Sequence, residues 1–307
     1  MSTKQKVMIV GSYNTDLAVR TPHIPVGGET IMGSGFVIGP GGKGANQAVA
    51  AARLGADTSM LVKLGKDIFG DQAAANLVKE GVRSENLLRS TEEPTGAAFI
   101  IVDQNGENII VVAGGANNSL SVDDVEKARP QIQQAKVLLL QLEVPLETVT
   151  RAVEIAHSAG VKVILNPAPG RNLDANLLAM VDVLTPNETE AQIITGMPVV
   201  SVQQAEAAGK KLISQGVGVV VITMGGKGSL VVSKDIVKHM PGYPVTVVDT
   251  TGAGDAFSGA LAVALSEDLQ LEDAVKFATA AAALQVTRFG TAPAMPYRQE
   301  VVDFLEK

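Results

Sequence analysis

One segment of the sequence combines small residues with a single acidic residue in a pattern that could do chemistry. Gly252, Ala253 and Gly254 precede Asp255, and an apolar helical pattern follows over residues 261–265. Small residues at a helix start leave backbone N–H groups bare, and the helix dipole favours anions there. Such amides would stabilise a transferring phosphoryl group, and Asp255 is placed to accept a proton from an attacking hydroxyl. An ordinary helix-cap carboxylate is the alternative interpretation of Asp255.

A second glycine-rich segment covers residues 39–47. Three of its glycines satisfy the spacing G-x-G-x-x-G, which alone is a weak indication of a dinucleotide site. The turn after the first predicted strand lacks such glycines, so a nicotinamide-dependent oxidoreductase has little support. Neither segment fits a P-loop, and no G-x-S-x-G motif occurs. The segment does allow close backbone approach to a ligand, with Lys43 and Asn46 beside it.

The elements that must position these segments are short apolar runs that alternate with helical patterns. Continuous Val, Ile and Leu runs separated by helices are typical of βαβ units on a parallel sheet covered on both faces. The sequence therefore predicts an α/β fold, a three-layer sandwich with a mostly parallel central sheet. The predicted strands cover residues 6–10, 136–140, 161–165, 181–184, 218–222 and 245–249.

Polar residues gather where these strands end, which is the edge at which ligands bind in open α/β sheets. Each one alone also has a structural explanation, as a turn former or a helix cap. Their convergence on one rim favours a ligand site. They are Asn14 and Asp16 after the first strand, and Gln141, Glu143, Asn166, Asn187, Glu190 and Thr223 after later ones, the last of which begins a glycine-rich run that includes Gly225 and Gly228.

Residues 95–112 do not follow the alternation of strands and helices. Two apolar runs flank Asn105-Gly106 there, which is a strong hairpin signal. Both faces of the hairpin are apolar, whereas a hairpin lying on one core should alternate. Either the same domain covers its outer face, or it belongs to a small lid sheet that packs against a second subunit.

Composition and charge exclude several classes of function. The net charge of −7 over 307 residues provides no basic stripe for nucleic acid. With 0 Cys and 3 scattered His, any metal should be a hard one bound by oxygen. No apolar stretch is long enough to cross a membrane, and the start lacks a signal-type segment, so we expect a cytoplasmic protein.

Three long motifs, far apart in the chain, resemble the ribokinase family of carbohydrate kinases. They are residues 41–47 (GGKGANQ), residues 187–190 (NETE) and residues 249–257 (DTTGAGDAF). The resemblance runs from Val7 to about Pro296, and includes residues 14–16, 167–169 and 286–288. It departs at Tyr13, which is bulkier than expected beside Asn14, and at Thr279, which replaces a larger polar residue near the adenine.

The resemblance implies ATP-dependent phosphorylation of D-ribose at its 5-hydroxyl, with deoxyribose, fructose or a nucleoside as alternative acceptors. A non-catalytic sugar- or nucleotide-binding regulator is the alternative from another class. Asp255 would be the catalytic base, with Gly252, Ala253 and Gly254 as the anion hole. The implied sugar-binding residues are Asn14, Asp16, Gly42, Lys43, Asn46, Glu143 and Asp255, and those for ATP are Asn187, Thr223, Gly225, Gly228, Gly254 and Thr279.

The resemblance also implies two metals and an assembly. Glu190 would bind Mg²⁺ through water. A K⁺ site would involve Asp249, Thr251, Gln285, Arg288 and Gly290. Residues 1–307 would form one kinase domain, whose lid strands at about 12–20, 30–40 and 95–113 would join two subunits into a homodimer.

Overall fold

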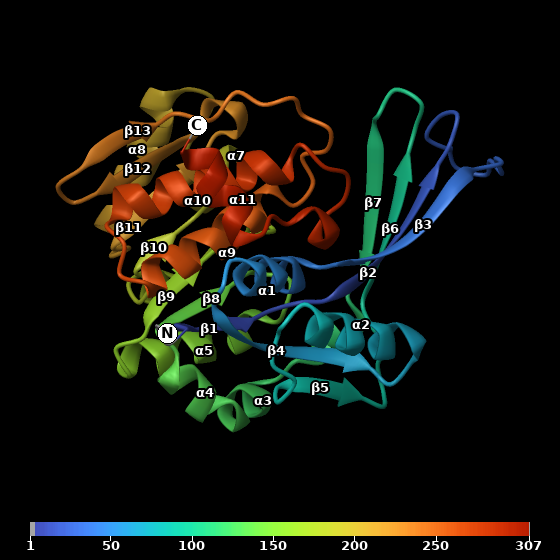
Figure 1. Ribbon diagram of the computed structural model, residues 1–307, viewed down its shortest axis with the longest axis horizontal. Coiled ribbons are helices and arrows are strands. Elements are labelled where there is room, and N and C mark those ends of the chain that lie inside the picture. The colour runs from blue at the N-terminus through green and yellow to red at the C-terminus, as the bar shows by residue number, and fades with distance from the viewer. Residues whose placement is uncertain (1–3, 307) are drawn as a thin grey trace.

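The central layer is a single twisted sheet, seen in Figure 1. Within residues 4–306, which the computed structural model describes, nine strands form it in the order β13-β12-β11-β10-β9-β8-β1-β4-β5. The strands from β11 to β5 are parallel, and β12 and β13 add an antiparallel edge. Their bounds are β1 (Lys6–Val10), β4 (Asp57–Gly65), β5 (Leu87–Ser90), β8 (Val137–Leu140), β9 (Lys162–Leu165), β10 (Val183–Leu184), β11 (Val219–Thr223), β12 (Ser229–Ser233) and β13 (Val237–Met240).

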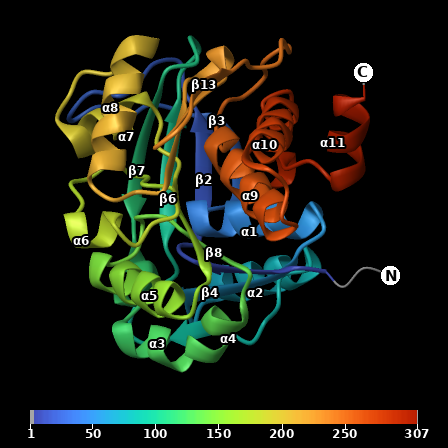
Figure 2. The same ribbon diagram turned by 90° about the vertical axis from the view of Figure 1, so that its left-hand side faces the viewer.

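Helices cover both faces of this sheet because its strands are apolar on both sides. In β1, Val7 and Ile9 enter one buried cluster, whereas Met8 and Val10 enter the other. This is the two-residue period of a strand buried on both faces. Figure 2 shows α9, α10 and α11 on one side and α5, α7 and α8 on the other. The predicted three-layer α/β architecture is confirmed.

The helices on the first side are α1 (Lys43–Arg53), α2 (Ile68–Lys79), α9 (Ala253–Ser266), α10 (Leu271–Gln285) and α11 (Arg298–Leu305). Those on the second side are α3 (Val122–Lys127), α4 (Arg129–Gln134), α5 (Leu146–Ser158), α6 (Ala175–Leu178), α7 (Glu188–Thr195) and α8 (Val202–Ser214). Short 3₁₀ turns occur at η1 (Gly115–Ser119), η2 (Gly225–Lys227) and η3 (Ala292–Ala294). None of the helices between residues 4 and 306 is both long enough and apolar enough to cross a bilayer.

A smaller, separate sheet projects from the side of these layers (Figure 1). Its order is β3-β2-β6-β7, with β2 (Asn14–Arg20), β3 (Ser34–Gly41), β6 (Ala97–Val102) and β7 (Asn108–Ala113). The hairpin predicted around Asn105-Gly106 joins β6 to β7. Its turn is tied by the carboxylate of Asp103, which accepts hydrogen bonds from the N–H groups of Asn105 and Glu107.

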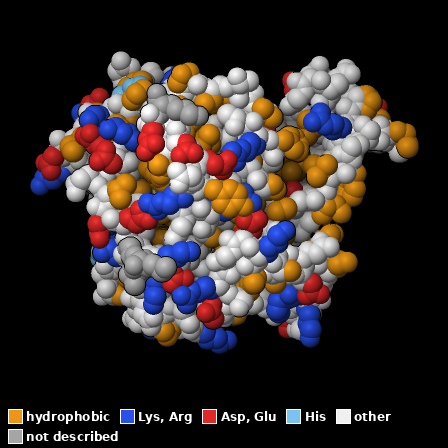
Figure 3. All heavy atoms as spheres, in the orientation of Figure 1, with side chains coloured by type: hydrophobic (Ala, Val, Ile, Leu, Met, Phe, Trp, Pro, Cys, Tyr) orange, Lys and Arg blue, Asp and Glu red, His pale blue; other side chains and the backbone are white. Residues whose placement is uncertain are grey.

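Many apolar side chains of this small sheet are not covered by the rest of the described chain. Phe36 on β3 is 63% exposed and Val111 on β7 is 60% exposed. Figure 3 shows hydrophobic side chains gathered along the projecting sheet. Of the two explanations of the hairpin pattern, burial within the same domain is therefore wrong.

The prediction of a strand over residues 245–249 is wrong, because this segment is irregular. The N–H groups of Val248 and Asp249 both point to the carbonyl of Val286 at the end of α10, at 2.8 and 3.2 Å. Pro244 has no N–H for a strand ladder. The β-branched run therefore serves as an extended lead into α9 without joining the sheet.

Candidate active site

Asp255 lies in the first turn of α9, at the centre of the site. The helix begins after Gly252, whose φ of 89° is a left-handed conformation that favours glycine. The N–H of Ala253 donates to the carbonyl of Thr250 at 3.2 Å. The N–H groups of Gly254 and Asp255 lie in the first turn, where a helix offers no acceptor of its own. These amides face the same end of the helix as the Asp255 carboxylate.

Two amide side chains of α1 hold the carboxylate of Asp255. Asn46 Nδ2 donates to Oδ2 at 2.9 Å, and Gln47 Nε2 donates to Oδ1 at 3.0 Å. Close packing of the two helices makes this possible, since a Cβ at Gly259 would lie 2.7 Å from the Cβ of Ala50. Burial raises the pKa of Asp255, and the Lys43 ammonium and the two amides oppose that rise. The donors favour an ionised carboxylate in a buried place.

A second set of polar groups lies where β1, β2 and β8 meet the start of α1. Glu143 Oε2 accepts hydrogen bonds from Ser12 Oγ at 2.5 Å and from the Lys43 N–H at 3.0 Å. Asn14 Oδ1 accepts a hydrogen bond from Asn117 Nδ2 at 2.9 Å. Asn14 is thus buried, whereas Lys43 and Glu143 are half-buried, and neighbours orient the polar side-chain oxygens of Asn14 and Glu143.

The electrostatics of this set centre on Asp16 and Lys43. Burial, followed by the charges of Glu143 and Asp255, raises the pKa of Asp16 to about 7. The charge of Asp255 raises the pKa of Lys43, against the effect of burial. A Cβ at Gly41 would lie 2.2 Å from an oxygen of Asp16, so the glycine-rich segment leaves room for this carboxylate. Gly42 has a φ of 86°, and a Cβ there would lie 2.6 Å from the backbone nitrogen of Asn14.

A cavity of about 200 Å³ opens on the other side of Asp255. The predicted residues Lys43, Asn187, Glu190, Thr223, Gly252, Gly254 and Asp255 line it. Gly225, Gly228 and Thr279 are not among its lining residues, and the Thr279 hydroxyl donates to the carbonyl of Val275. The cavity therefore joins three predicted motifs, with Asp255 between it and the Asp16 set.

Several residues of this cavity were not predicted for the site. Thr185 follows β10, and Ser258 lies one helical turn after Asp255, so that the two hydroxyls are 3.3 Å apart. Thr250 and Ala168 complete the set of missed residues. Thr185 could have been predicted from its position at the end of a strand. For Ser258, the sequence offers no indication beyond its spacing from Asp255.

A family model described as pfkB family carbohydrate kinase matches residues 4–298. The chain belongs to this family. It is 42% identical over 303 residues to a ribokinase of Haemophilus influenzae, with 99% of each chain covered. It is 40% identical over 300 residues to a deoxyribokinase of Salmonella typhi, covering 97% of this chain and 98% of that one. A solved structure of Arabidopsis thaliana ribokinase complexed with ribose and ATP superposes with a TM-score of 0.92 at 36% identity, covering 99% and 100% of the two chains.

Membership in the pfkB family makes the chain a carbohydrate kinase. Asp255, with its amide donors and the nearby helix N-terminus, has the features that phosphoryl transfer to a hydroxyl requires. The large mostly parallel sheet and the separate small sheet are shared with the ribokinase neighbours. The resemblance found from the three motifs is confirmed.

In this pfkB kinase, Asn187 and Glu190 form the capping box of α7. Asn187 Oδ1 accepts a hydrogen bond from the Glu190 N–H at 2.8 Å, and Glu190 Oε2 accepts one from the Asn187 N–H at 2.9 Å. Burial raises the pKa of Glu190. Residues 4–306 contain no group of three acidic, His or Cys side chains that could hold a metal directly. One buried carboxylate beside the cavity fits Mg²⁺, which keeps most of its waters and needs few protein ligands.

The residues expected around K⁺ join two loops behind the anion-hole segment. The carboxylate of Asp249 accepts hydrogen bonds from the N–H groups of Thr251 and Gly290, at 2.9 and 3.0 Å. Gln285 Nε2 donates to the carbonyl of Thr251 at 2.6 Å and to that of Gly290 at 3.0 Å. Each carbonyl keeps a second lone pair, so this oxygen set fits a hard monovalent cation. The guanidinium of Arg288 pairs with Glu300 on α11.

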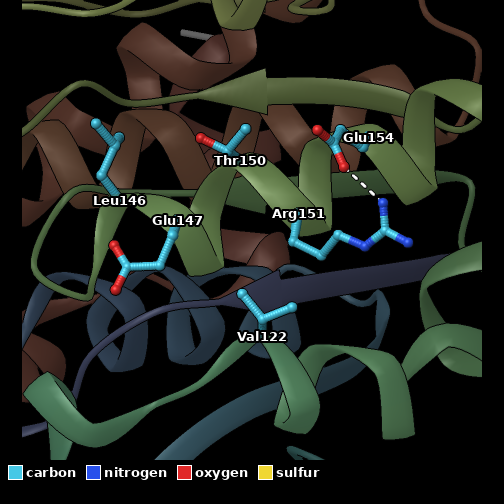
Figure 4. A pocket seen from close by; sticks show the side chains of 6 residues that line it. All are labelled: Val122, Leu146, Glu147, Thr150, Arg151 and Glu154. Atoms are coloured by element: carbon cyan, nitrogen blue, oxygen red, sulfur yellow. Dashed lines mark hydrogen bonds and ion pairs between the residues drawn. The ribbon is translucent and has the colours of Figure 1, made fainter.

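A larger hollow of about 540 Å³ lies between α3 and α5, away from Asp255 (Figure 4). Its one cationic side chain, Arg151, is paired with Glu154 and with Glu126, both at 2.6 Å. The remaining lining residues are Val122, Leu146, Glu147 and Thr150. With its one cation paired and no buried base among its lining, this hollow does not resemble a transfer site.

Proposed function

We propose that this chain transfers the γ-phosphoryl group of ATP to the 5-hydroxyl of D-ribose, giving ribose 5-phosphate and ADP. The observation that carries the proposal is the place of Asp255, buried between a polar set suited to a polyhydroxy sugar and a cavity at a helix N-terminus. The ribokinase relatives at about 40% identity over the full chain, and the neighbour solved with ribose and ATP, support it.

In the proposed reaction Asp255 accepts the proton of the sugar hydroxyl as its oxygen attacks the γ-phosphorus. The bond between that phosphorus and the β–γ bridging oxygen breaks, and ADP leaves. The amides of Gly252, Ala253 and Gly254 stabilise the charge on the transferring group. The Ala253 N–H must leave its long bond to Thr250 O to take part fully.

The sugar is bound by the polar set around α1. Ionised Asp16 accepts hydrogen bonds from sugar hydroxyls, while Lys43 and Asn46 donate them. Glu143 uses one oxygen to hold Ser12 and the Lys43 backbone, which leaves its other oxygen for the sugar. Asn14 and the backbone at Gly42 complete the set. A site built of paired donors and acceptors discriminates strongly against sugars that lack a partner hydroxyl.

ATP lies along the cavity beyond Asp255. Asn187, Thr223, Gly225, Gly228, Gly254 and Thr279 are the residues proposed to border it. Mg²⁺, when bound, neutralises phosphate charge. Glu190 would hold its hydration shell, and K⁺ would bind among the oxygens of the Asp249 and Gly290 loops, with Thr251 and the backbone carbonyls near Gln285 and Arg288 contributing.

The small sheet is proposed to act as a lid and as the contact between two subunits of a homodimer. Its exposed apolar face, with Phe36, Phe99 and Val111, has the character of a protein interface. The rest of the chain forms one kinase domain with it, and the lid strands are those near 12–20, 30–40 and 95–113.

A second candidate acceptor is 2-deoxyribose, because two deoxyribokinases are 40% identical to this chain. Sugar-dependent ADP release should be measured with D-ribose, 2-deoxyribose and D-fructose at fixed MgATP. D-ribose is expected to have the highest kcat/KM. A higher kcat/KM for 2-deoxyribose would make that sugar the preferred acceptor. The absence of ADP release with any sugar would overturn the proposal.

A further inference from the structure

We infer that Gln47 is a positioning residue for phosphoryl transfer: its side-chain amide fixes the Asp255 carboxylate so that a lone pair of Oδ2 faces the acceptor hydroxyl. The inference rests on the proposed role of Asp255 as the base. It concerns a residue that lies behind the base and lines neither the cavity nor the sugar set.

The amide of Gln47 is fully buried, and its orientation is determined by three hydrogen bonds. Its Nε2 donates to Asp255 Oδ1 and to Asn166 Oδ1, both at 3.0 Å, and its Oε1 accepts from Gln141 Nε2 at 2.5 Å. A flipped amide would turn its oxygen toward two acceptors and its donors toward another donor. Gln47 therefore has one orientation in which every polar atom is satisfied.

The network continues from Gln47 into the central sheet. Gln141 and Asn166 follow β8 and β9, and Asn166 Nδ2 donates to the Thr185 carbonyl after β10 at 3.0 Å. Gln141 is packed against Gly11, where a Cβ would lie 2.1 Å from Gln141 Oε1. Three neighbouring strand ends thus anchor one oxygen of Asp255, independently of the helix that carries it.

The two oxygens of Asp255 consequently have different roles. Oδ1 is occupied by Gln47, which the sheet holds in place. Oδ2 accepts a hydrogen bond from Asn46, a residue of the proposed sugar set, and keeps a second lone pair for the hydroxyl. A carboxylate without its Oδ1 anchor would rotate about its side-chain bonds, and misplacement of about 1 Å costs on the order of 10²-fold in rate.

Gln47→Met tests the inference, since it keeps the length and volume of the side chain and removes both donors. We expect kcat to fall by about 10–100-fold, with the ribose KM within about 2-fold of the parent value. The loss of a donor also raises the pKa of Asp255, so the acid limb of the kcat/KM profile should move to higher pH. Lys43, Asp16, Glu143 and Glu190 also act on that profile and stay in place, so the difference between variant and parent isolates Gln47.

A matched control is Gln131→Met on α4, which removes a glutamine amide far from the site and should leave kcat, KM and the pH profile unchanged. Thermal unfolding of both variants checks the fold. If Gln47→Met does not fold, Gln141→Met loses only the bond that orients Gln47, and a smaller change of the same kind is expected. A folded variant with the parent kcat and acid limb overturns the inference.

Asp255→Asn, measured beside it, separates this inference from the proposed function. Loss of turnover in Asp255→Asn with a parent-like Gln47→Met would refute the positioning role alone. Retained turnover in Asp255→Asn would refute the role of Asp255 as the base, and this inference with it, whereas the proposed function itself falls only if the parent releases no ADP with any sugar.

Discussion

The carboxylate of Glu143 accepts a hydrogen bond from the backbone N–H of Lys43, at 3.0 Å, in the first turn of α1. An acidic residue after β8 thus satisfies a donor at the start of a helix that lies 100 residues earlier in the chain. The start of α1 has no side-chain cap of its own, because Gly42 occupies the capping position. The same carboxylate therefore stabilises the helix and faces the proposed sugar set.

Ser12→Ala should weaken sugar binding through Glu143. The Ser12 hydroxyl donates to Glu143 Oε2, and a hydrogen bond to a charged group is worth about 1.5–3 kcal/mol. We expect the ribose KM to rise by about 10-fold or more, with kcat reduced by less than 3-fold. Steady-state kinetics with varied ribose checks this, and a fall in kcat at constant KM would contradict it.

Asp255→Asn should lower kcat by roughly 10²–10⁴-fold while MgATP still binds, because an amide cannot accept the hydroxyl proton. Nucleotide affinity measured by calorimetry is the control. The variant is close in size, so the packing against Asn46 and Gln47 should persist. Turnover close to that of the parent would exclude Asp255 as the base.

Asp16→Asn should stabilise the sugar-free protein at alkaline pH. The pKa of Asp16 is raised to about 7, from a usual value near 4, so the folded state binds a proton that the unfolded state has lost between these values. Its contribution to stability is present below pH 4 and is lost as the pH rises through 7. At pH 8 we expect the variant to have a higher Tm, by about 2–4 °C for each kcal/mol by which the substitution raises the free energy of unfolding. Near pH 4 we expect little difference between the two proteins.

The cost of that substitution should appear in ribose binding. Ionised Asp16 is the proposed acceptor of sugar hydroxyls, so the parent should bind ribose better at pH 8 than at pH 6, and Asp16→Asn should lose this dependence. Calorimetric titration at both pH values checks the pair of outcomes. An equal pH dependence in both proteins would contradict the proposed role of this carboxylate.

Gln285→Ala should make the protein more dependent on a monovalent cation. The amide of Gln285 bridges the carbonyls of Thr251 and Gly290, which belong to the loops that would share K⁺. Without the amide the loops rely on the cation alone. We expect the free energy of unfolding to fall by about 1–3 kcal/mol in choline chloride and to recover in part in potassium chloride. The Tm of the variant and the parent in each salt measures this. Equal Tm values in the two salts would count against a cation at this place.

Val111→Glu should disrupt the proposed homodimer. Val111 lies on β7 with 60% of its surface exposed, and a buried unpaired carboxylate at an interface is costly. Sedimentation velocity should show a dimer for the parent and a monomer for the variant. Lys4→Gln, at an exposed position outside the small sheet, lowers the net charge by the same one unit and is a charge-matched control. A parent that is already monomeric at micromolar concentration would refute the proposed assembly.

Much of the scaffold could be predicted from local patterns alone. Apolar runs such as residues 6–10 become strands buried on both faces, and the hairpin at Asn105-Gly106 forms as its turn residues predict. The irregular path of residues 245–249 could not be predicted in this way. A β-branched run favours a strand only when a neighbouring strand offers hydrogen bonds, and here the carbonyl of Val286 accepts them.

The sequence by itself determined the chemistry: the small residues at 252–254, the one carboxylate at Asp255, and the polar residues that follow the strands. Those features are local, and their physical meaning follows from helix starts and strand ends. Only the tertiary structure decided which amides hold that carboxylate. Gln47 and Asp255 are 208 positions apart, and their contact depends on the packing of α1 against α9 and of both against the sheet. Directed hydrogen bonds between distant segments leave no periodic pattern in a sequence, so the network behind Asp255 becomes visible only when the chain is folded.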